Sequence, residues 1–151
     1  MTAVPKPALH HMALTVSDVD ASVAWYEAVF GVRYLVDVPH EGGVGKLLTD
    51  DEWTLMIVLH RHDANEGGLF SERQTGLDHV GLAVETRADL ERWEEHLDAN
   101  GVVRADPADK PLTRSAIMDE VYASVVVFRD PDNIQLELFA PAATRGPVPG
   151  Q

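Results

Sequence analysis

The chain has 151 residues, 45% of them apolar, with 12 basic against 25 acidic residues and a formal net charge of −13. This length suits one ordinary domain or two small modules that share a core, and the strong negative charge disfavours nucleic acid and anionic membranes as partners. Because the chain has no cysteine, a bound metal has to be held by His, Asp or Glu, which draws attention to the seven histidines.

Residues 1–8 form an N-terminal tail that lacks the basic and apolar regions of a signal peptide. No apolar run approaches the roughly 20 residues that a membrane helix needs. We therefore expect a soluble, cytoplasmic protein.

The first predicted unit, residues 9–60, reads as βαβββ. A strand over 9–16 leads into a helix that is capped within 17–20 and ends near Phe30, with Gly31 as a left-handed stop. The helix presents an apolar stripe of Val19, Val23, Tyr26 and Phe30. Three further strands are predicted over 32–38, 45–48 and 53–60.

After a linker over 61–76, residues 77–140 repeat the same order of elements. Thr86, with Asp89 three residues later, predicts the start of a helix that ends before Gly101 and buries Leu90, Trp93 and Leu97. The following strands are predicted over 102–103, 123–128 and 134–139, the last two joined by a tight turn around Pro131 and Asn133. Residues 141–151 form a Pro-rich tail.

An internal repeat links the two halves. The pattern H-x-x-L-x-V occurs at His11 and again at His79, 68 residues later, and Trp25 and Trp93 have the same spacing. The sequence therefore predicts an α+β fold of two tandem βαβββ modules.

Strand alternation separates the histidines from the helix-facing residues. Met12, Leu14 and Val16 share one face of the first strand, which leaves His11 on the other face beside small residues, and His79 has the same placement. A single histidine at a strand end is more often a surface or hydrogen-bonded residue, but the repetition indicates a site. His10 is predicted to point to the opposite face and to be structural, since Asp78 stands in its place in the second copy.

Glu137 is an isolated acid in the last strand, with large apolar neighbours on both sides. A buried carboxylate is costly unless it is paired or bound to a cation. Glu137 is therefore exposed to solvent on an alternating strand, paired with another group, or bound to a cation.

Three motifs together resemble the vicinal oxygen chelate superfamily, which includes glyoxalase I, bleomycin-resistance proteins, fosfomycin-modifying transferases, methylmalonyl-CoA epimerase and extradiol dioxygenases. They are the HHMALTVSD stretch followed by ASVAWY and FG, then GLDHVGLAV at 76–84, and FRDPDNIQLELF at 128–139. The resemblance spans residues 9–139.

The resemblance implies a single glyoxalase-like domain in which the two modules curve into a cup-shaped mixed sheet, with the helices outside and a divalent metal inside. The family's ligand positions fall on His11, His79 and Glu137. Two imidazoles and a carboxylate suit Zn²⁺, Mn²⁺, Ni²⁺ or Fe²⁺. Members of the family commonly form homodimers.

A fourth ligand is missing where four-ligand members carry Glu or Gln. Alignment of the last strands of the two modules places Ile57 opposite Glu137. His60 at the strand end and His62 in the linker are the alternatives, although both also fit a surface loop.

The resemblance implies a divalent-metal enzyme that chelates neighbouring oxygens of a small-molecule substrate, as a lyase, isomerase or transferase. Trp53, His60 and Tyr122 are candidates for shaping the substrate site, and no catalytic base is identified. The alternative is a metal-free protein of the bleomycin-resistance kind, which binds a cationic or drug-like ligand.

Two activities within the superfamily fit the sequence less well. Ring-cleaving dioxygenases carry Tyr and His before the last turn, where this chain has Val127 and other non-histidine residues. A phosphonate substrate needs a cationic pocket, which a net charge of −13 disfavours, although Lys110, Arg114 and Arg129 are candidates for a local contribution.

Overall fold

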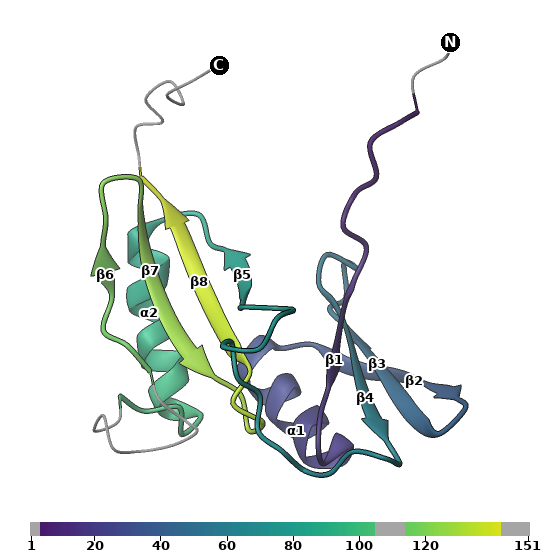
Figure 1. Cartoon of the computed structure of the whole chain (residues 1–151). Helices are drawn as coiled ribbons and strands as arrows, with labels where there is room; N and C mark the ends of the chain where they lie inside the picture. Colours follow the sequence, from purple (N-terminus) through teal and green to yellow (C-terminus); the bar gives the residue numbers. More distant parts are fainter. Residues whose placement is uncertain (1–3, 105–113, 143–151) are drawn as a thin grey trace. The chain divides into compact units, whose positions relative to one another are not determined.

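The computed structural model describes residues 4–104 and 114–142 (Figure 1). The chain divides between Glu66 and Gly67 into two compact units, here called module one and module two. Each has one helix and one four-stranded mixed sheet, which confirms the predicted α+β fold of two βαβββ repeats.

Module one follows the predicted order of elements. Its elements are β1 (Met12–Thr15), α1 (Val19–Phe30), β2 (Arg33–His40), β3 (Gly43–Thr49) and β4 (Met56–His62). The sheet order is β1-β4-β3-β2, with β1 parallel to β4 and the other neighbours antiparallel. The β2–β3 hairpin is tight because Gly42 takes the left-handed φ of 76° that such a turn requires.

The ends of α1 are those that the sequence predicts. The Asp18 carboxylate accepts hydrogen bonds from the backbone N–H groups of Asp20 and Ala21, and Gly31 ends the helix with φ 68°. The buried stripe differs from the predicted one, because Val23 and Phe30 are only half-buried. The fully buried positions follow the helical repeat from the first residue and are Val19, Ser22, Tyr26 and Val29.

Module two contains β5 (Val80–Ala83), α2 (Arg87–Ala99), β6 (Met118–Asp119), β7 (Ala123–Arg129) and β8 (Gln135–Pro141). Its sheet order, β5-β8-β7-β6, matches that of module one, again with a parallel pair formed by the first and last strands. The predicted strand over 102–103 was wrong. Val102 instead closes the end of α2 by donating its N–H to the Leu97 carbonyl (2.9 Å), and β6 supplies the edge strand.

Helix α2 starts with the predicted capping box. The Asp89 N–H donates to the Thr86 hydroxyl, and the Asp89 carboxylate accepts the Thr86 N–H at 2.8 Å. Leu90 and Leu97 are fully buried, whereas Trp93 is half-buried and its ring lies edge-on to His96.

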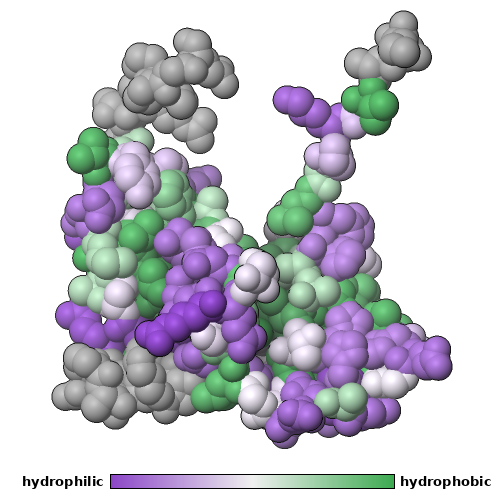
Figure 2. Space-filling view, in the orientation of Figure 1, coloured by the Kyte–Doolittle hydropathy of each residue, from purple (hydrophilic) through white to green (hydrophobic). Residues whose placement is uncertain are grey.

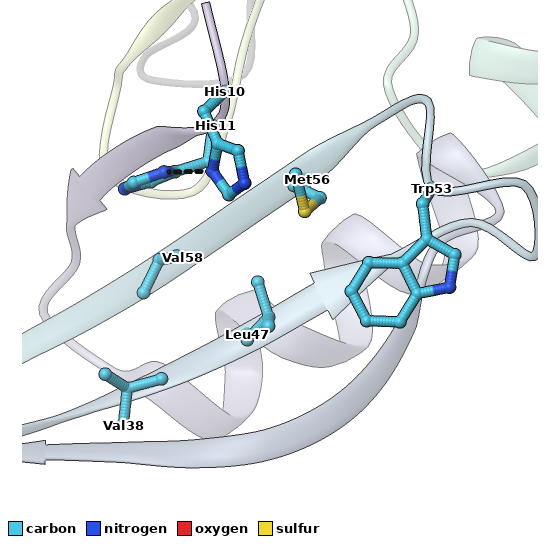
Figure 3. Close-up of a pocket in the computed structure, with 7 residues that line it drawn as sticks. All are labelled: His10, His11, Val38, Leu47, Trp53, Met56 and Val58. Carbon is cyan, nitrogen blue, oxygen red and sulfur yellow. Dashed lines mark hydrogen bonds between the residues drawn. The ribbon is translucent and has the colours of Figure 1, made fainter.

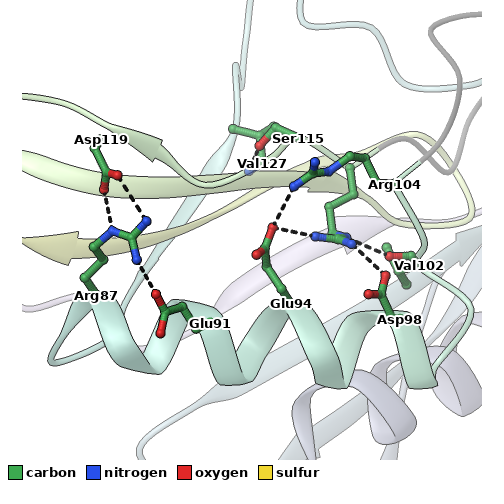
Figure 4. A network of polar contacts seen from close by, with 10 residues as sticks. Arg87, Glu91, Glu94, Asp98, Val102, Arg104, Ser115, Asp119 and Val127 are labelled. Carbon is green, nitrogen blue, oxygen red and sulfur yellow. Dashed lines mark hydrogen bonds and ion pairs between the residues drawn. The ribbon is translucent and has the colours of Figure 1, made fainter.

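Arg114 links α2 to the loop that follows it. Its guanidinium donates to Glu94 Oε1 (2.8 Å), Asp98 Oδ1 (2.6 Å) and the Val102 carbonyl (3.0 Å), and its side chain is only 4% exposed. Figure 4 shows Glu94 and Asp98 projecting from one side of α2 into this network. Arg87 forms a second link, from the start of the helix to Asp119 at 2.7 Å.

The turn between β7 and β8 sets the register of the last strand. The Asp130 carboxylate accepts the N–H groups of Asp132 (3.0 Å) and Ile134 (2.7 Å), and Asn133 takes the expected left-handed φ of 68°. The result is that Val127 pairs with Glu137.

Hydrophilic residues are spread over much of the surface seen in Figure 2, with smaller hydrophobic patches between them. Within the described residues, neither helix has the length and apolar character needed to cross a bilayer.

Candidate functional site

Each sheet has a helix-facing side and an open face, which we define as the side turned away from the buried core. In β1, Leu14 is buried while His11, which precedes the strand, and Ala13 and Thr15 are exposed on the open face. The alternation inferred for His11 is therefore confirmed. The pairing of Ala13 with Val58 places Val58 on the same face.

A pocket of about 510 Å³ lies on the open face of module one (Figure 3). Its lining residues are His10, His11, Val38, Leu47, Trp53, Met56 and Val58. Apart from the two imidazoles, the wall is largely apolar. Such a pocket suits the apolar part of a small molecule, with polar contacts at one end.

The prediction that His10 points away from His11 was wrong, because both residues line this pocket. A hydrogen bond of 3.0 Å joins their Nδ1 atoms, as Figure 3 shows, and the rings meet edge to face. The physical reason is that β1 begins only at Met12, so the strict alternation of a strand does not extend back to His10.

Trp53 enters the pocket from the loop between β3 and β4 with a backbone φ of 59°. Left-handed backbone is strained for a bulky residue. Asp50 fixes the loop, since its carboxylate accepts hydrogen bonds from the Thr54 hydroxyl and from the N–H groups of Thr54 and Leu55. These hydrogen bonds, the one from the Thr54 hydroxyl first, lower the pKa of Asp50.

In module two, His79 directly precedes β5, and Glu137 lies on the neighbouring strand β8. Glu137 is in register with Gly81, two residues after His79, so the two side chains share the open face. An ideal Cβ on Gly81 would lie 3.7 Å from Glu137 Oε1, which shows that the carboxylate extends over this glycine. Glu137 is half-buried, and the side chain of His79 is 39% exposed.

Asp78 orients His79. Its Oδ1 lies 2.7 Å from His79 Nδ1, so that Nδ1–H donates to the carboxylate and Nε2 carries the lone pair. Metal-binding histidines are commonly held in this way, with the second ring nitrogen bonded to a carboxylate. The sequence analysis missed this role of Asp78, although an acid directly before a candidate ligand was a usable signal.

The residue in module one that corresponds to Glu137 is Val58, and the alignment with Ile57 was wrong by one residue. Val58 pairs with Ala13, just as Glu137 pairs with Gly81 in the other module. Ile57 is fully buried on the opposite side of the sheet. The corresponding open-face position in module one is therefore apolar.

His60 and His62 both lie in β4, so His62 is part of the strand and not of a loop. His60 pairs with Thr15, four residues beyond the level of His11, which is about 13 Å along a strand at ~3.3 Å per residue. At that separation, His60 and His11 do not serve as neighbouring ligands of one ion. Burial lowers the pKa of His60, with smaller effects from His40, His62 and His11.

Tyr122 precedes β7 and is 69% exposed, with its ring stacked near Phe139 at a centroid distance of 6.4 Å.

The predicted site residues therefore fall into two groups. Trp53 and His11 share the pocket of module one, and His79 and Glu137 share the open face of module two.

Arg114 and Arg129, two of the residues considered for binding a phosphonate, already form ion pairs with carboxylates. Arg114 is held by Glu94 and Asp98, and Arg129 donates to Glu72 at 3.0 and 3.1 Å and to Gln135. Lys110 lies outside the described residues. Among residues 4–104 and 114–142, no group of three or more His, Cys, Asp or Glu side chains is arranged to hold a metal ion.

The model of the Glyoxalase/Bleomycin resistance protein/Dioxygenase superfamily matches residues 8–138. The chain belongs to this superfamily. This confirms the resemblance drawn from the strand and turn motifs. No curated protein matches the chain.

Solved structures of the superfamily share the fold. A glyoxylase/bleomycin resistance protein/dioxygenase domain from Frankia sp. EAN1pec is 29% identical, with a TM-score of 0.78 over 92% of this chain and 95% of that chain. The fosfomycin resistance protein FosX from Listeria monocytogenes is 18% identical, with a TM-score of 0.65 over 91% of this chain and 94% of its own.

A structure of a FosX variant was determined in complex with Mn(II) and 1S,2S-dihydroxypropylphosphonic acid. That chain is 17% identical to this one, with a TM-score of 0.62 over 92% of this chain and 96% of its own. At this level of identity, the likeness shows a common fold.

Proposed function

We propose that this protein is a divalent-metal enzyme that binds neighbouring oxygens of a small-molecule substrate, as a lyase, isomerase or transferase. The expected metal ligands are His11, His79 and Glu137. The observation that carries the proposal is the shared open face of His79 and Glu137, with Nδ1 of His79 bonded to Asp78.

The donor set fits such an ion. Asp78 leaves His79 Nε2 free to bind, and the half-buried Glu137 carboxylate supplies an oxygen beside it. Neutral imidazole and carboxylate together suit Zn²⁺, Mn²⁺, Ni²⁺ or Fe²⁺. The bound ion would act as a Lewis acid on the substrate oxygens.

The residues of the chain have separate tasks in this proposal. Val58 occupies the open-face position that corresponds to Glu137, so three protein ligands leave room for substrate oxygens. Trp53 forms an apolar wall of the module-one pocket and is a candidate for contact with an apolar part of the substrate. His60 and Tyr122 are candidates for further substrate contacts on their own modules.

The substrate proposed here carries an apolar group and is not a phosphonate. The apolar lining of the pocket favours a hydrophobic substituent, and both described arginines considered for anion binding are engaged by carboxylates. Ring cleavage is disfavoured too, since Val127 lies opposite Glu137, where an acid–base group would be needed.

Metal analysis of the untagged protein tests the proposal. We expect at least one equivalent of a divalent metal in the wild type and about one equivalent less in His79→Ala, with both proteins folded by circular dichroism. Arg92→Ala serves as a matched control, because Arg92 is an exposed residue of α2. A metal content that His79→Ala leaves unchanged would overturn the enzyme proposal, whatever other site holds metal.

The apolar pocket also favours a second candidate, a metal-free protein that binds a drug-like ligand. A thermal-shift screen with diketones, thiol adducts and antibiotics, in the presence of a chelator, separates the two. Stabilisation that persists with the chelator and is lost in Trp53→Ala supports this candidate, whereas stabilisation that requires metal supports the enzyme.

We further propose that the protein is a cytoplasmic homodimer. Light scattering, which measures the mass of the particle in solution, tests the oligomeric state.

A further inference from the structure

A cluster of three histidines lies on the open face of module one, beyond the end of the pocket. His40 ends β2, and His60 and His62 lie in β4. The ring centroid of His40 lies 5.0 Å from that of His60 and 4.8 Å from that of His62, and the centroids of His60 and His62 are 6.1 Å apart. We call these residues the imidazole cluster.

The strand register explains why the three rings meet. Gly43 of β3 pairs with both His40 and His62, and Gly45 pairs with His60. Paired residues on neighbouring strands point to the same face, so the histidines surround two positions without side chains. Strand pairing thus gathers three imidazoles from β2 and β4, the two neighbours of β3, over β3 itself.

The two glycines provide the space that the rings occupy. An ideal Cβ on Gly43 would lie 2.6 Å from His40 Cε1 and 3.0 Å from His40 Nε2. One on Gly45 would lie 2.7 Å from both Cε1 and Nδ1 of His60. No other residue type fits beneath these rings as they stand.

Two ring nitrogens of the cluster are buried without a hydrogen-bond partner, namely His40 Nε2 and His60 Nδ1. His40 Nδ1 lies 3.1 Å from the Glu41 carbonyl and donates to it, so Nε2 carries the lone pair in the neutral ring. Buried polar atoms are nearly always hydrogen-bonded, and those that are not indicate a ligand, an ion or a catalytic role. These two nitrogens lie in one cluster.

The surroundings of His60 favour its neutral form. Burial is the main cause of the lowered pKa of His60, and the other contributions come from His40, His62 and His11. No carboxylate contributes to this shift. An uncharged set of nitrogen donors without a carboxylate suits late first-row transition ions and does not suit Mg²⁺ or Ca²⁺.

We propose that the imidazole cluster is a second metal site of the protein, which takes Zn²⁺, Ni²⁺ or Cu²⁺ through His40 Nε2 and His60 Nδ1. His62 is the third donor and reaches the ion when its ring turns, since in the structure the three rings do not converge on one point. The site shares no donor with the one proposed for His11, His79 and Glu137, since its three donors belong to β2 and β4.

Metal titration of a background variant, His79→Ala with Glu137→Ala, tests this site separately from the one proposed above. We expect Zn²⁺ calorimetry to give one equivalent in this variant, and Cu²⁺ to give an electron paramagnetic resonance spectrum with coupling to at least two nitrogens. Adding His40→Gln or His60→Gln should lower the affinity at least about tenfold. His96→Gln is the matched control, since that imidazole lies on α2, and it should have no effect.

A measurement without further substitution guards against misfolding of the histidine variants. In the background variant, Zn²⁺ should shift the imidazole proton signals of His40 and His60 in the NMR spectrum and leave those of His96 in place. Binding of less than about 0.1 equivalent, or an affinity that His40→Gln and His60→Gln both leave unchanged, would overturn the proposal. Metal that the wild type loses through His79→Ala alone reports on the site proposed for His79 and Glu137 and not on the imidazole cluster.

Discussion

The two modules share one architecture but differ on their open faces. Met12 pairs with Ile57 in module one as Val80 pairs with Leu136 in module two, so the first and last strands align alike in both. The helix-facing positions are apolar in both, and the open face carries Val58 in one module and Glu137 in the other. Packing against the helix therefore constrains one side of each sheet, while the other side is free to acquire chemistry.

The residue before each first-strand histidine shows the same divergence. His10 and Asp78 occupy corresponding places, and each contacts Nδ1 of the next histidine, at 3.0 and 2.7 Å. A carboxylate fixes the tautomer and raises the basicity of the ring, whereas an imidazole does so less. By this difference, His79 is better prepared than His11 for the metal binding proposed above.

The largest expected effect on metal affinity comes from replacing the corresponding open-face residues, Glu137 and Val58, by alanine. Glu137→Ala should weaken divalent-metal binding at least about 100-fold, because it removes a direct ligand, whereas loss of a ligand's hydrogen-bond partner already costs about 10–100-fold. Val58→Ala should leave metal affinity unchanged. Calorimetry with Zn²⁺ measures both, and equal losses in the two variants would contradict the asymmetry between the modules.

The next largest effect on metal affinity concerns Asp78 and His10, which precede His79 and His11. We expect Asp78→Ala to lower metal affinity about tenfold, since His79 then loses the carboxylate that orients it. The corresponding change His10→Ala should have a smaller effect. Competition with a chromophoric chelator resolves such differences, and a larger loss in His10→Ala than in Asp78→Ala would reverse the assignment.

Two glycines on the open faces give a comparison in stability. Gly45→Ala should destabilise the protein by about 1–3 kcal/mol, because the new Cβ would lie 2.7 Å from the His60 ring and 3.0 Å from the Val38 carbonyl. Gly81→Ala makes only an ordinary contact at 3.7 Å and should be neutral or stabilising by about 0.5–1 kcal/mol. Urea denaturation tests both, and an equal effect would show that the rings above Gly45 move aside freely.

The smallest effect depends on pH and concerns the segment before β5. Hydrogen bonds from Arg129 lower the pKa of Glu72 from 4.5 to about 2. A carboxyl group whose pKa is lower in the folded state stabilises the protein fully above its unfolded pKa, and this contribution is lost as the pH falls from about 4.5 to about 2. Wild type should therefore be more stable than Glu72→Gln at pH 7, and the difference should shrink over that range. A difference that grows on acidification would contradict the predicted sign.

Much of the fold followed from local sequence signals. The capping box at Thr86, the left-handed glycine at Gly31 and the Asn133 turn all depend on residues within a few positions of one another, and all three are confirmed. Register between distant strands has no such local signal. For that reason the sequence alignment placed the module-one counterpart of Glu137 at Ile57, although the pairing of β4 with β1 shows that the counterpart is Val58.

The sequence by itself determined the duplication, the order of elements and the face on which His11 and His79 lie, because helix and strand periodicities are properties of short segments. Only the tertiary structure brought His10 into a pocket, bonded Asp78 to His79 and gathered His40, His60 and His62 over two glycines. These contacts depend on where a strand begins and on which strands pair, and backbone hydrogen bonding and core packing across the whole sheet decide both.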